Sequence, residues 1–91
     1  LDLHYKKIND PRLRELSSDL GSNTTLTSLN LIWNEIKGPG CEYLALALES
    51  NSTLLELNLG YNWMLDIGAI HLSTALMSNS TLTKLSLNGN M

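Results

Sequence analysis

The chain has 91 residues, a mass of 10.1 kDa and a formal net charge of −3, so it can form one small domain or a part of a larger one. Only 16% of its residues are charged, and without a basic excess for phosphate contacts we expect no nucleic-acid partner. No apolar run approaches the roughly 18 residues of a membrane span, so we expect no membrane partner. Leucine fills 21 positions, a bias that indicates a repeating pattern.

A 28-residue period runs along the whole chain. It divides the single segment 1–91 into copies at about 1–25, 26–53 and 54–81 and a partial copy at 82–91. The corresponding positions are Leu29, Leu31 and Asn34; Leu57, Leu59 and Asn62; and Leu85, Leu87 and Asn90. The first copy departs twice, with Lys6 where asparagine is expected and Arg12 where glycine is expected. Because burying an unpaired cation is costly, we expect both side chains to face water.

Each copy begins as a strand and continues as a helix. Alternating leucines, as in residues 29–31, are typical of a half-buried strand. The residues that follow are spaced i, i+3, i+4, i+7 as on one face of a helix, which in the second copy gives Cys41, Leu44, Ala45 and Leu48. We predict that Asp10 caps the first helix, with Pro11 at its first position, and that Asp66 caps the third.

The only cysteine, Cys41, has no partner for a disulfide within the chain. It also lacks the neighbouring cysteine or histidine that a metal site would need. We therefore interpret it as a small buried apolar residue. This cysteine usage favours a reducing, cytoplasmic compartment.

Asparagines recur at two places in each copy. Asn34, Asn62 and Asn90 follow the predicted strands, where we expect inward-facing amides that bond to the turn and to the neighbouring copy. Asn23, Asn51 and Asn79 follow the helices and each begin an Asn-x-Ser/Thr sequence. Glycosylation is one interpretation of these three sites. Turn formation is the alternative, favoured because all three occupy the same return loop.

We predict no catalytic, cofactor-binding or metal-binding residues. An enzyme needs convergent acid–base or nucleophilic groups, and the two histidines, His4 and His71, fall on different elements. Asp2 shares a strand face with His4, but no nucleophile lies near them in the sequence. We interpret the two as a solvated polar pair.

Solvent-facing positions of the predicted strands form columns that run across the copies. From these columns we predict a protein-binding surface on the concave face, formed by Tyr5, Asn30, Trp33, Glu56, Asn58, Tyr61, Trp63 and Lys84. One column holds Tyr5, Trp33 and Tyr61, and tyrosine and tryptophan are enriched among residues that dominate binding energy. The alternative is that the rings pack on one another and stiffen the stack. The sequence leaves both interpretations open, and both can hold together.

The segment 26–36, Leu-Thr-Ser-Leu-Asn-Leu-Ile-Trp-Asn-Glu-Ile, resembles the leucine-rich repeat signature L-x-x-L-x-L-x-x-N-x-L. The period and the glycines Gly40 and Gly68 before each full helix resemble the ribonuclease-inhibitor-like subclass. That subclass includes repeat domains of intracellular nucleotide-binding immune receptors and of Ran GTPase activators. The resemblance covers essentially the whole chain. It implies an α/β leucine-rich repeat solenoid, a horseshoe arc with a parallel sheet on the concave face and helices on the convex face.

The resemblance also implies a non-catalytic, cytoplasmic module that binds a protein partner through its concave face and needs no cofactor. One alternative is a structural scaffold or autoinhibitory arc within a larger intracellular assembly. A weaker alternative is part of a GTPase-activator-type repeat domain, whose specific polar loop residues have no match in this chain. Because repeat arrays end in atypical caps and none is recognisable here, we expect a longer array, with flanking repeats or neighbouring chains covering both ends.

Overall fold

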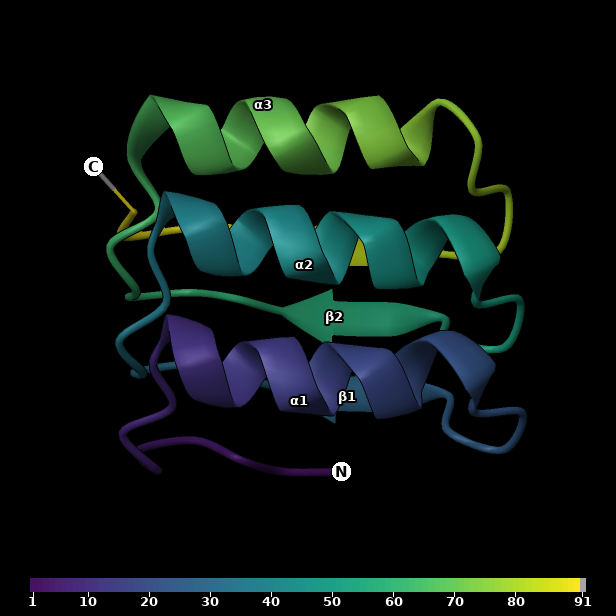
Figure 1. Ribbon diagram of the computed structural model, residues 1–91, viewed down its shortest axis with the longest axis horizontal. Helices are drawn as coiled ribbons and strands as arrows, with labels where there is room; N and C mark the ends of the chain where they lie inside the picture. Colours follow the sequence, from purple (N-terminus) through teal and green to yellow (C-terminus); the bar gives the residue numbers. More distant parts are fainter. Residues whose placement is uncertain (91) are drawn as a thin grey trace.

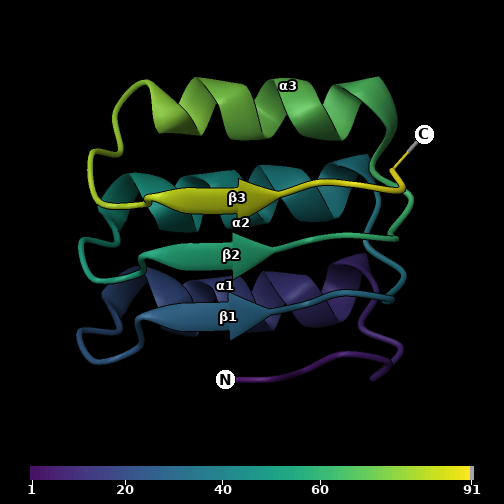
Figure 2. The ribbon, with the colours of Figure 1, turned by 180° about the vertical axis from the view of Figure 1, so that it is seen from behind.

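The computed structural model describes residues 1–90, in which helices and strands alternate along the chain. The helices are α1 (Asp10–Ser22), α2 (Gly38–Ser50) and α3 (Leu65–Leu76), and the strands are β1 (Ser28–Asn30), β2 (Glu56–Asn58) and β3 (Lys84–Ser86). The helices form one layer in front of the strands (Figure 1), and the sheet lies open on the opposite side (Figure 2). The predicted α/β class with parallel strands and helices is confirmed. The partial copy 82–91 ends at Met91, which lies outside the described residues.

The three strands pair in the order β1-β2-β3, and both pairings are parallel. Leu29 lies opposite Leu57, and Leu57 lies opposite Leu85. An isolated bridge between Asp2 and Asn30 extends the pairing to the beginning of the chain. Corresponding residues of successive copies therefore stand side by side, and a surface property that recurs in the sequence becomes a column across the sheet.

The core lies between the sheet and the helices. Its largest fully buried side chains are aliphatic, and they include Leu29, Leu57 and Leu59 from the strand layer and Leu44 and Leu48 from α2. Burial of each such side chain contributes roughly 1.5–3 kcal/mol. Because a three-residue strand has few hydrogen bonds of its own, packing between the two layers holds the elements together.

Cys41 is fully buried in this core, as predicted. Burial penalises the thiolate, and together with the negative charge of Asp10 it raises the pKa of the Cys41 thiol to about 12. The thiol is therefore neutral at physiological pH and behaves as a small apolar side chain.

The predicted caps are wrong for both helices. The N-cap of α1 is Asn9, whose Oδ1 accepts a hydrogen bond from the backbone N–H of Arg12 at 3.2 Å. The Asp10 carboxylate instead accepts from the backbone N–H of Lys37 at 2.8 Å and links the first turn to the second. α3 has Met64 at its N-cap with no side-chain cap bond. Adjacent asparagine and aspartate are both good cap formers, so sequence alone does not separate them.

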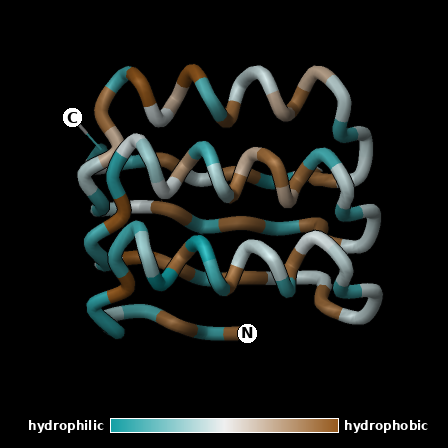
Figure 3. The backbone as a smooth tube through the Cα atoms, viewed as in Figure 1, coloured by the Kyte–Doolittle hydropathy of each residue, from teal (hydrophilic) through white to brown (hydrophobic). Residues whose placement is uncertain are grey.

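The helix layer changes in character along the chain. α1 exposes the charged side chains of Arg12 and Arg14, whereas α3 exposes Leu65, Ile67 and Ile70. The same contrast is visible in the hydropathy of the two helices in Figure 3. None of the helices within residues 1–90 combines the length and hydropathy that crossing a bilayer requires.

Candidate functional site

The open face of the sheet, opposite the helices, carries four of the predicted binding residues. Glu56 and Lys84 are paired in the strand register and both are exposed. Asn30 and Asn58 form the neighbouring column and are half-buried. A shallow hollow of about 190 Å³ lies over these strands. This face offers charged and amide groups on a flat surface, which suits contact with another protein better than enclosure of a small molecule.

Asp2 and His4 extend this face toward the first copy. The Nδ1 atom of His4 lies 2.8 Å from Oδ1 of Asp2, and both side chains are exposed. The hydrogen bonds from His4 lower the pKa of the Asp2 carboxyl. The Asn30 amide donates to the same carboxylate oxygen at 3.1 Å. The pair is solvated, as predicted, and it joins the first copy to the second.

The second group of predicted residues lies beyond the strand ends, on an edge that we call the aromatic edge. Here Tyr5, Trp33 and Tyr61 form a continuous stack. The ring centroids of Tyr5 and Trp33 are 5.5 Å apart at an interplanar angle of 12°, and those of Trp33 and Tyr61 are 4.3 Å apart at 6°. The three side chains remain 66%, 45% and 41% exposed. The rings therefore contact one another and still present their edges to solvent.

The backbone beneath the stack is in the left-handed region. Tyr5, Trp33 and Tyr61 have φ values of 54°, 56° and 53°, which for non-glycine residues costs roughly 1–2 kcal/mol each. The fourth copy has Gly89 at this position, with φ of 77°. A Cβ there would lie 2.5 Å from Cδ1 of Tyr61, so the Gly89 backbone covers the last ring. Three copies thus retain an aromatic side chain where glycine is the unstrained choice.

Buried asparagine side chains hold the turns of the aromatic edge in register. Oδ1 of Asn34 accepts from the backbone N–H groups of Lys6 and Ile8, both at 3.0 Å. The Asn62 amide donates to the backbone oxygens of Leu31 and Leu59 at 3.0 and 3.1 Å. The predicted structural role of these asparagines is confirmed. The Lys6 side chain is exposed, as expected, although its backbone N–H joins this network.

The opposite edge, where the chain returns from helix to strand, carries serine and threonine around Asn23, Asn51 and Asn79, and we call it the Ser/Thr edge. Asn51 is buried, and its Nδ2 donates to the backbone oxygen of Leu20 at 2.8 Å. Asn79 bonds in the same way to the backbone oxygen of Leu48 at 2.7 Å. These amide nitrogens are engaged in the fold, which supports the turn interpretation over glycosylation for Asn51 and Asn79.

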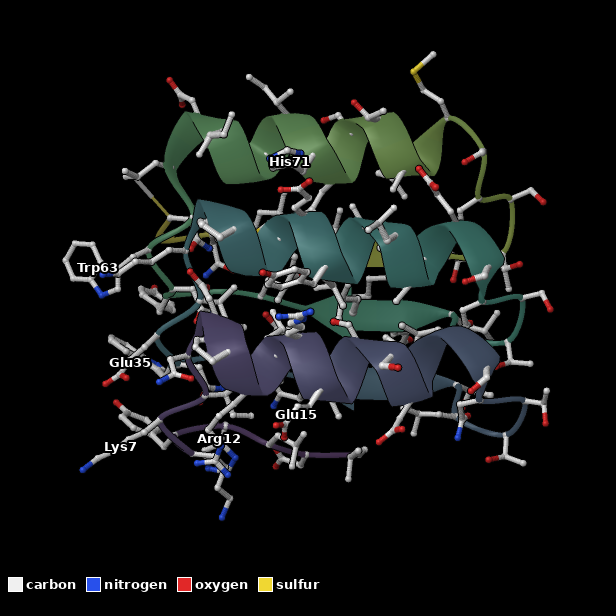
Figure 4. The ribbon with its side chains drawn as sticks, in the orientation of Figure 1. Lys7, Arg12, Glu15, Glu35, Trp63 and His71 are labelled. Atoms are coloured by element: carbon white, nitrogen blue, oxygen red, sulfur yellow. The ribbon has the colours of Figure 1, made fainter. Side chains whose placement is uncertain are left out.

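A groove of about 440 Å³ runs along the aromatic edge. The stacked rings of Trp33 and Tyr61 line it. Lys7, Glu35 and Trp63 also line it and occupy equivalent positions in successive copies. These three side chains project outward one above the other in Figure 4, and we call them the outer wall. Trp63 is 64% exposed, and no aromatic partner contacts it among residues 1–90. The groove is therefore open and mostly apolar, with Lys7 and Glu35 as its charged lining residues.

The structure divides the predicted site residues into two groups. Asn30, Glu56, Asn58 and Lys84 lie on the open face of the sheet, and Tyr5, Trp33, Tyr61 and Trp63 lie on the aromatic edge. Sequence reasoning missed Lys7 and Glu35 as members of this second group. The signal was available, because residues 7, 35 and 63 are spaced by the same 28 residues as the stacked rings.

Within the part of the chain that the structure describes, no cluster of three histidine, cysteine or acidic side chains could hold a metal ion. His71 lies on α3 (Figure 4), on a different element from His4, as predicted. The most nucleophilic side chain type, cysteine, is present once and is buried with a raised pKa. The prominent groups of the site are aromatic, amide and charged surface side chains.

Comparisons with known proteins point to one family. Residues 22–45 and 50–73, more than half of the chain, match the family described as Leucine Rich repeat, and no enzyme family is indicated. No curated protein matches. Among the solved structures, leiomodin-1 actin-binding site 2 is similar, with a TM-score of 0.77 and 32% sequence identity over 89% of this chain. The chain spans about half of that structure, 48% of its length.

Proposed function

Because the chain belongs to the leucine-rich repeat family, we propose that it is a non-catalytic module that binds a protein partner through the concave face of a repeat array. In this proposal the open face of the sheet is the inner surface of a horseshoe arc built from 28-residue repeats of the ribonuclease-inhibitor-like subclass. Parallel strands 4.7–4.9 Å apart, backed by helices about 10 Å wide, favour such curvature. Repeat families use the resulting surface for binding.

The observation that carries this proposal is the composition of the open face. Glu56 and Lys84 project into solvent on neighbouring strands, and neither has an ion pair within residues 1–90. The core beneath them is formed by leucines of the same strands and does not require these charges. Exposed groups of opposite sign at fixed spacing supply electrostatic complementarity to a partner.

A matched pair of charge reversals tests the proposal. Glu56→Arg changes the centre of the open face, and Glu42→Arg makes the same change on the exposed surface of α2. Proteins captured from cell extract by the parent chain should be retained by the Glu42→Arg variant and lost by the Glu56→Arg variant, as quantified by mass spectrometry. The reverse pattern would place recognition on the helix layer and refute the concave-face proposal.

A second candidate function is a scaffold in a cytoskeletal assembly. The observation that favours it is the similarity to leiomodin-1 actin-binding site 2 at 32% identity. Actin is therefore the first purified protein to test, by co-sedimentation of the chain with actin filaments. Binding that survives Glu42→Arg and is lost in Glu56→Arg would support both candidate functions, with actin bound through the open face of the sheet. Absence of the chain from the pellet would exclude actin as the partner.

We propose a cytoplasmic location for the protein. The support is Cys41, a single thiol that is buried and unpaired in the folded chain, as is usual in a reducing compartment. Fractionation of cells with an antibody to the chain tests this location, and recovery in the secreted fraction would refute it.

A further inference from the structure

We propose that the groove of the aromatic edge binds an arginine side chain presented by the protein partner. This inference rests on the proposed protein-binding function and adds a second contact to it, beyond the open face of the sheet. Its elements are the Glu35 carboxylate, the Trp63 indole and the stacked rings of Trp33 and Tyr61, which all line one groove of about 440 Å³.

The charge of the groove selects a cation at its centre. Glu35 is exposed, and no cation lies within ion-pair distance of its carboxylate among residues 1–90. Along the outer wall, Glu35 has Lys7 on one side and Trp63 on the other (Figure 4). The ammonium of Lys7 repels a second cation, so the favourable position is on the other side of Glu35, between its carboxylate and Trp63.

A carboxylate beside an exposed indole favours a planar cation. A guanidinium can donate two parallel hydrogen bonds to a carboxylate and stack on an aromatic face at the same time, whereas an ammonium is a compact, strongly hydrated point charge. Tryptophan is the best aromatic partner for a cation, and Trp63 has most of its surface free. Glu35 and Trp63 occupy equivalent positions in adjacent copies, so the carboxylate and the ring are neighbours across one repeat.

Backbone hydrogen bonds between copies hold the residues that line the groove. The N–H of Glu35 donates to the backbone oxygen of Ile8, and the N–H of Trp63 donates to that of Ile36, both at 2.9 Å. The stack opposite is held by the N–H of Tyr61, which donates to the backbone oxygen of Asn88 at 2.8 Å. Walls that are ordered before binding lose little conformational entropy on association, which allows one side chain to contribute measurably.

The two tryptophans of the chain both line the groove, so their indole N–H signals report on its occupancy. The experiment titrates the ¹⁵N-labelled full chain with N-acetylarginine amide and follows both signals by NMR. We expect both to shift with a dissociation constant in the millimolar range. The neutral isostere N-acetylcitrulline amide should leave them unmoved, and N-acetyllysine amide, with its free side-chain ammonium, should bind at least about fivefold more weakly.

Two variants separate the carboxylate from general surface charge. Glu35→Gln should weaken binding of N-acetylarginine amide about tenfold, which corresponds to about 1.4 kcal/mol. Glu42→Gln, a matched change on the helix layer, should leave the affinity unchanged. Equal shifts with the citrulline and arginine amides, equal affinity for the lysine and arginine amides, or insensitivity to Glu35→Gln would each overturn the arginine site. None of these results depends on the capture experiment with Glu56→Arg, so failure of the arginine site is distinguishable from failure of the proposed function.

Discussion

Asparagine side chains hold together both the aromatic edge and the Ser/Thr edge, but they form different hydrogen bonds on the two edges. On the aromatic edge, Asn34 reaches the preceding copy with both its carbonyl oxygen and its amide nitrogen. On the Ser/Thr edge, the amide of Asn51 reaches the preceding copy, while its oxygen accepts from the N–H groups of Thr53 and Leu54 in its own turn. The clear difference lies in the carbonyl oxygens, which accept from the preceding copy on the aromatic edge and from the residue's own turn on the Ser/Thr edge.

The surfaces of the two edges differ even more. The Ser/Thr edge carries small hydroxyl residues that favour turns. The aromatic edge carries the stacked rings of Tyr5, Trp33 and Tyr61 on left-handed backbone. Since asparagine amides hold the Ser/Thr edge in register without any aromatic side chain, joining the copies does not require rings. Strained backbone is often retained at functional sites, which supports the proposed use of the aromatic edge in recognition.

The largest expected effect is on stability, and it compares the asparagines of the two edges. Asn62→Ala leaves the buried N–H of Ile36 without its acceptor. The backbone oxygens of Leu31 and Leu59 each lose one amide donor and keep a second, from Asn34 and Asn90. At roughly 1–3 kcal/mol for the unsatisfied N–H and roughly 0.5–1.5 kcal/mol for each lost hydrogen bond, we expect a loss of about 2–4 kcal/mol, measured by urea unfolding. Asn51→Ala should cost about 1 kcal/mol less, because water can reach part of its turn. An equal or smaller loss for Asn62→Ala would contradict the stronger contribution expected of the aromatic-edge asparagine.

A smaller effect is expected at the end of the stack. Gly89→Ala places a Cβ against the Tyr61 ring at a positive φ. We expect a loss of about 1–2 kcal/mol in thermal unfolding and a change in the near-ultraviolet circular dichroism of the rings. A neutral substitution would mean that the chain after β3 does not close against Tyr61.

The buried thiol of Cys41, in the core between the two edges, gives a pH-dependent prediction. The pKa of the Cys41 thiol is about 12 in the folded chain, against an ordinary value of 9.0. Folding therefore favours the protonated thiol, and this contribution to stability is complete below pH 9 and is lost as the pH rises from 9 to 12. The stability difference between the parent chain and Cys41→Ala should shrink over that window in urea titrations. A difference that is constant with pH would contradict burial of the thiol.

The smallest stability effect is expected at the outer wall of the groove. Trp63 is mostly exposed and has no stacking partner within residues 1–90, so Trp63→Ala should change the free energy of unfolding by less than about 0.5 kcal/mol. Leu57→Ala, in the core, serves as the reference and should cost about 2–5 kcal/mol. A loss above 2 kcal/mol for Trp63→Ala would make this side chain a packing residue.

Much of this architecture could be predicted from the sequence. A period sustained without gaps places Leu29 opposite Leu57, and the switch from alternation to helical spacing separates strand from helix. The one-residue error at the α1 cap arose because Asn9 and Asp10 are both suited to capping and only the tertiary contact of Asp10 with Lys37 distinguishes them.

The site was less predictable than the fold. Assigning residues to columns grouped Tyr5, Trp33 and Tyr61 with the strand residues, because this pattern treats every position as if it lay on the strand. It could not show that the backbone turns into the left-handed region at these three residues and moves their rings to an edge. The groove was not predicted for a related reason. The residues of its outer wall are a lysine, a glutamate and a tryptophan, which have the same spacing as the rings but differ in residue type.

Site-specific photo-cross-linking tests most directly whether recognition uses the aromatic edge. The cross-linker p-benzoylphenylalanine replaces Lys7 at the end of the groove in one variant and Ser52 on the Ser/Thr edge in another; both positions are exposed. In cell extract, we expect a discrete protein adduct from position 7 that excess N-acetylarginine amide suppresses, and no discrete adduct from position 52. Adducts formed equally from both positions, or only from position 52, would contradict recognition through the aromatic edge.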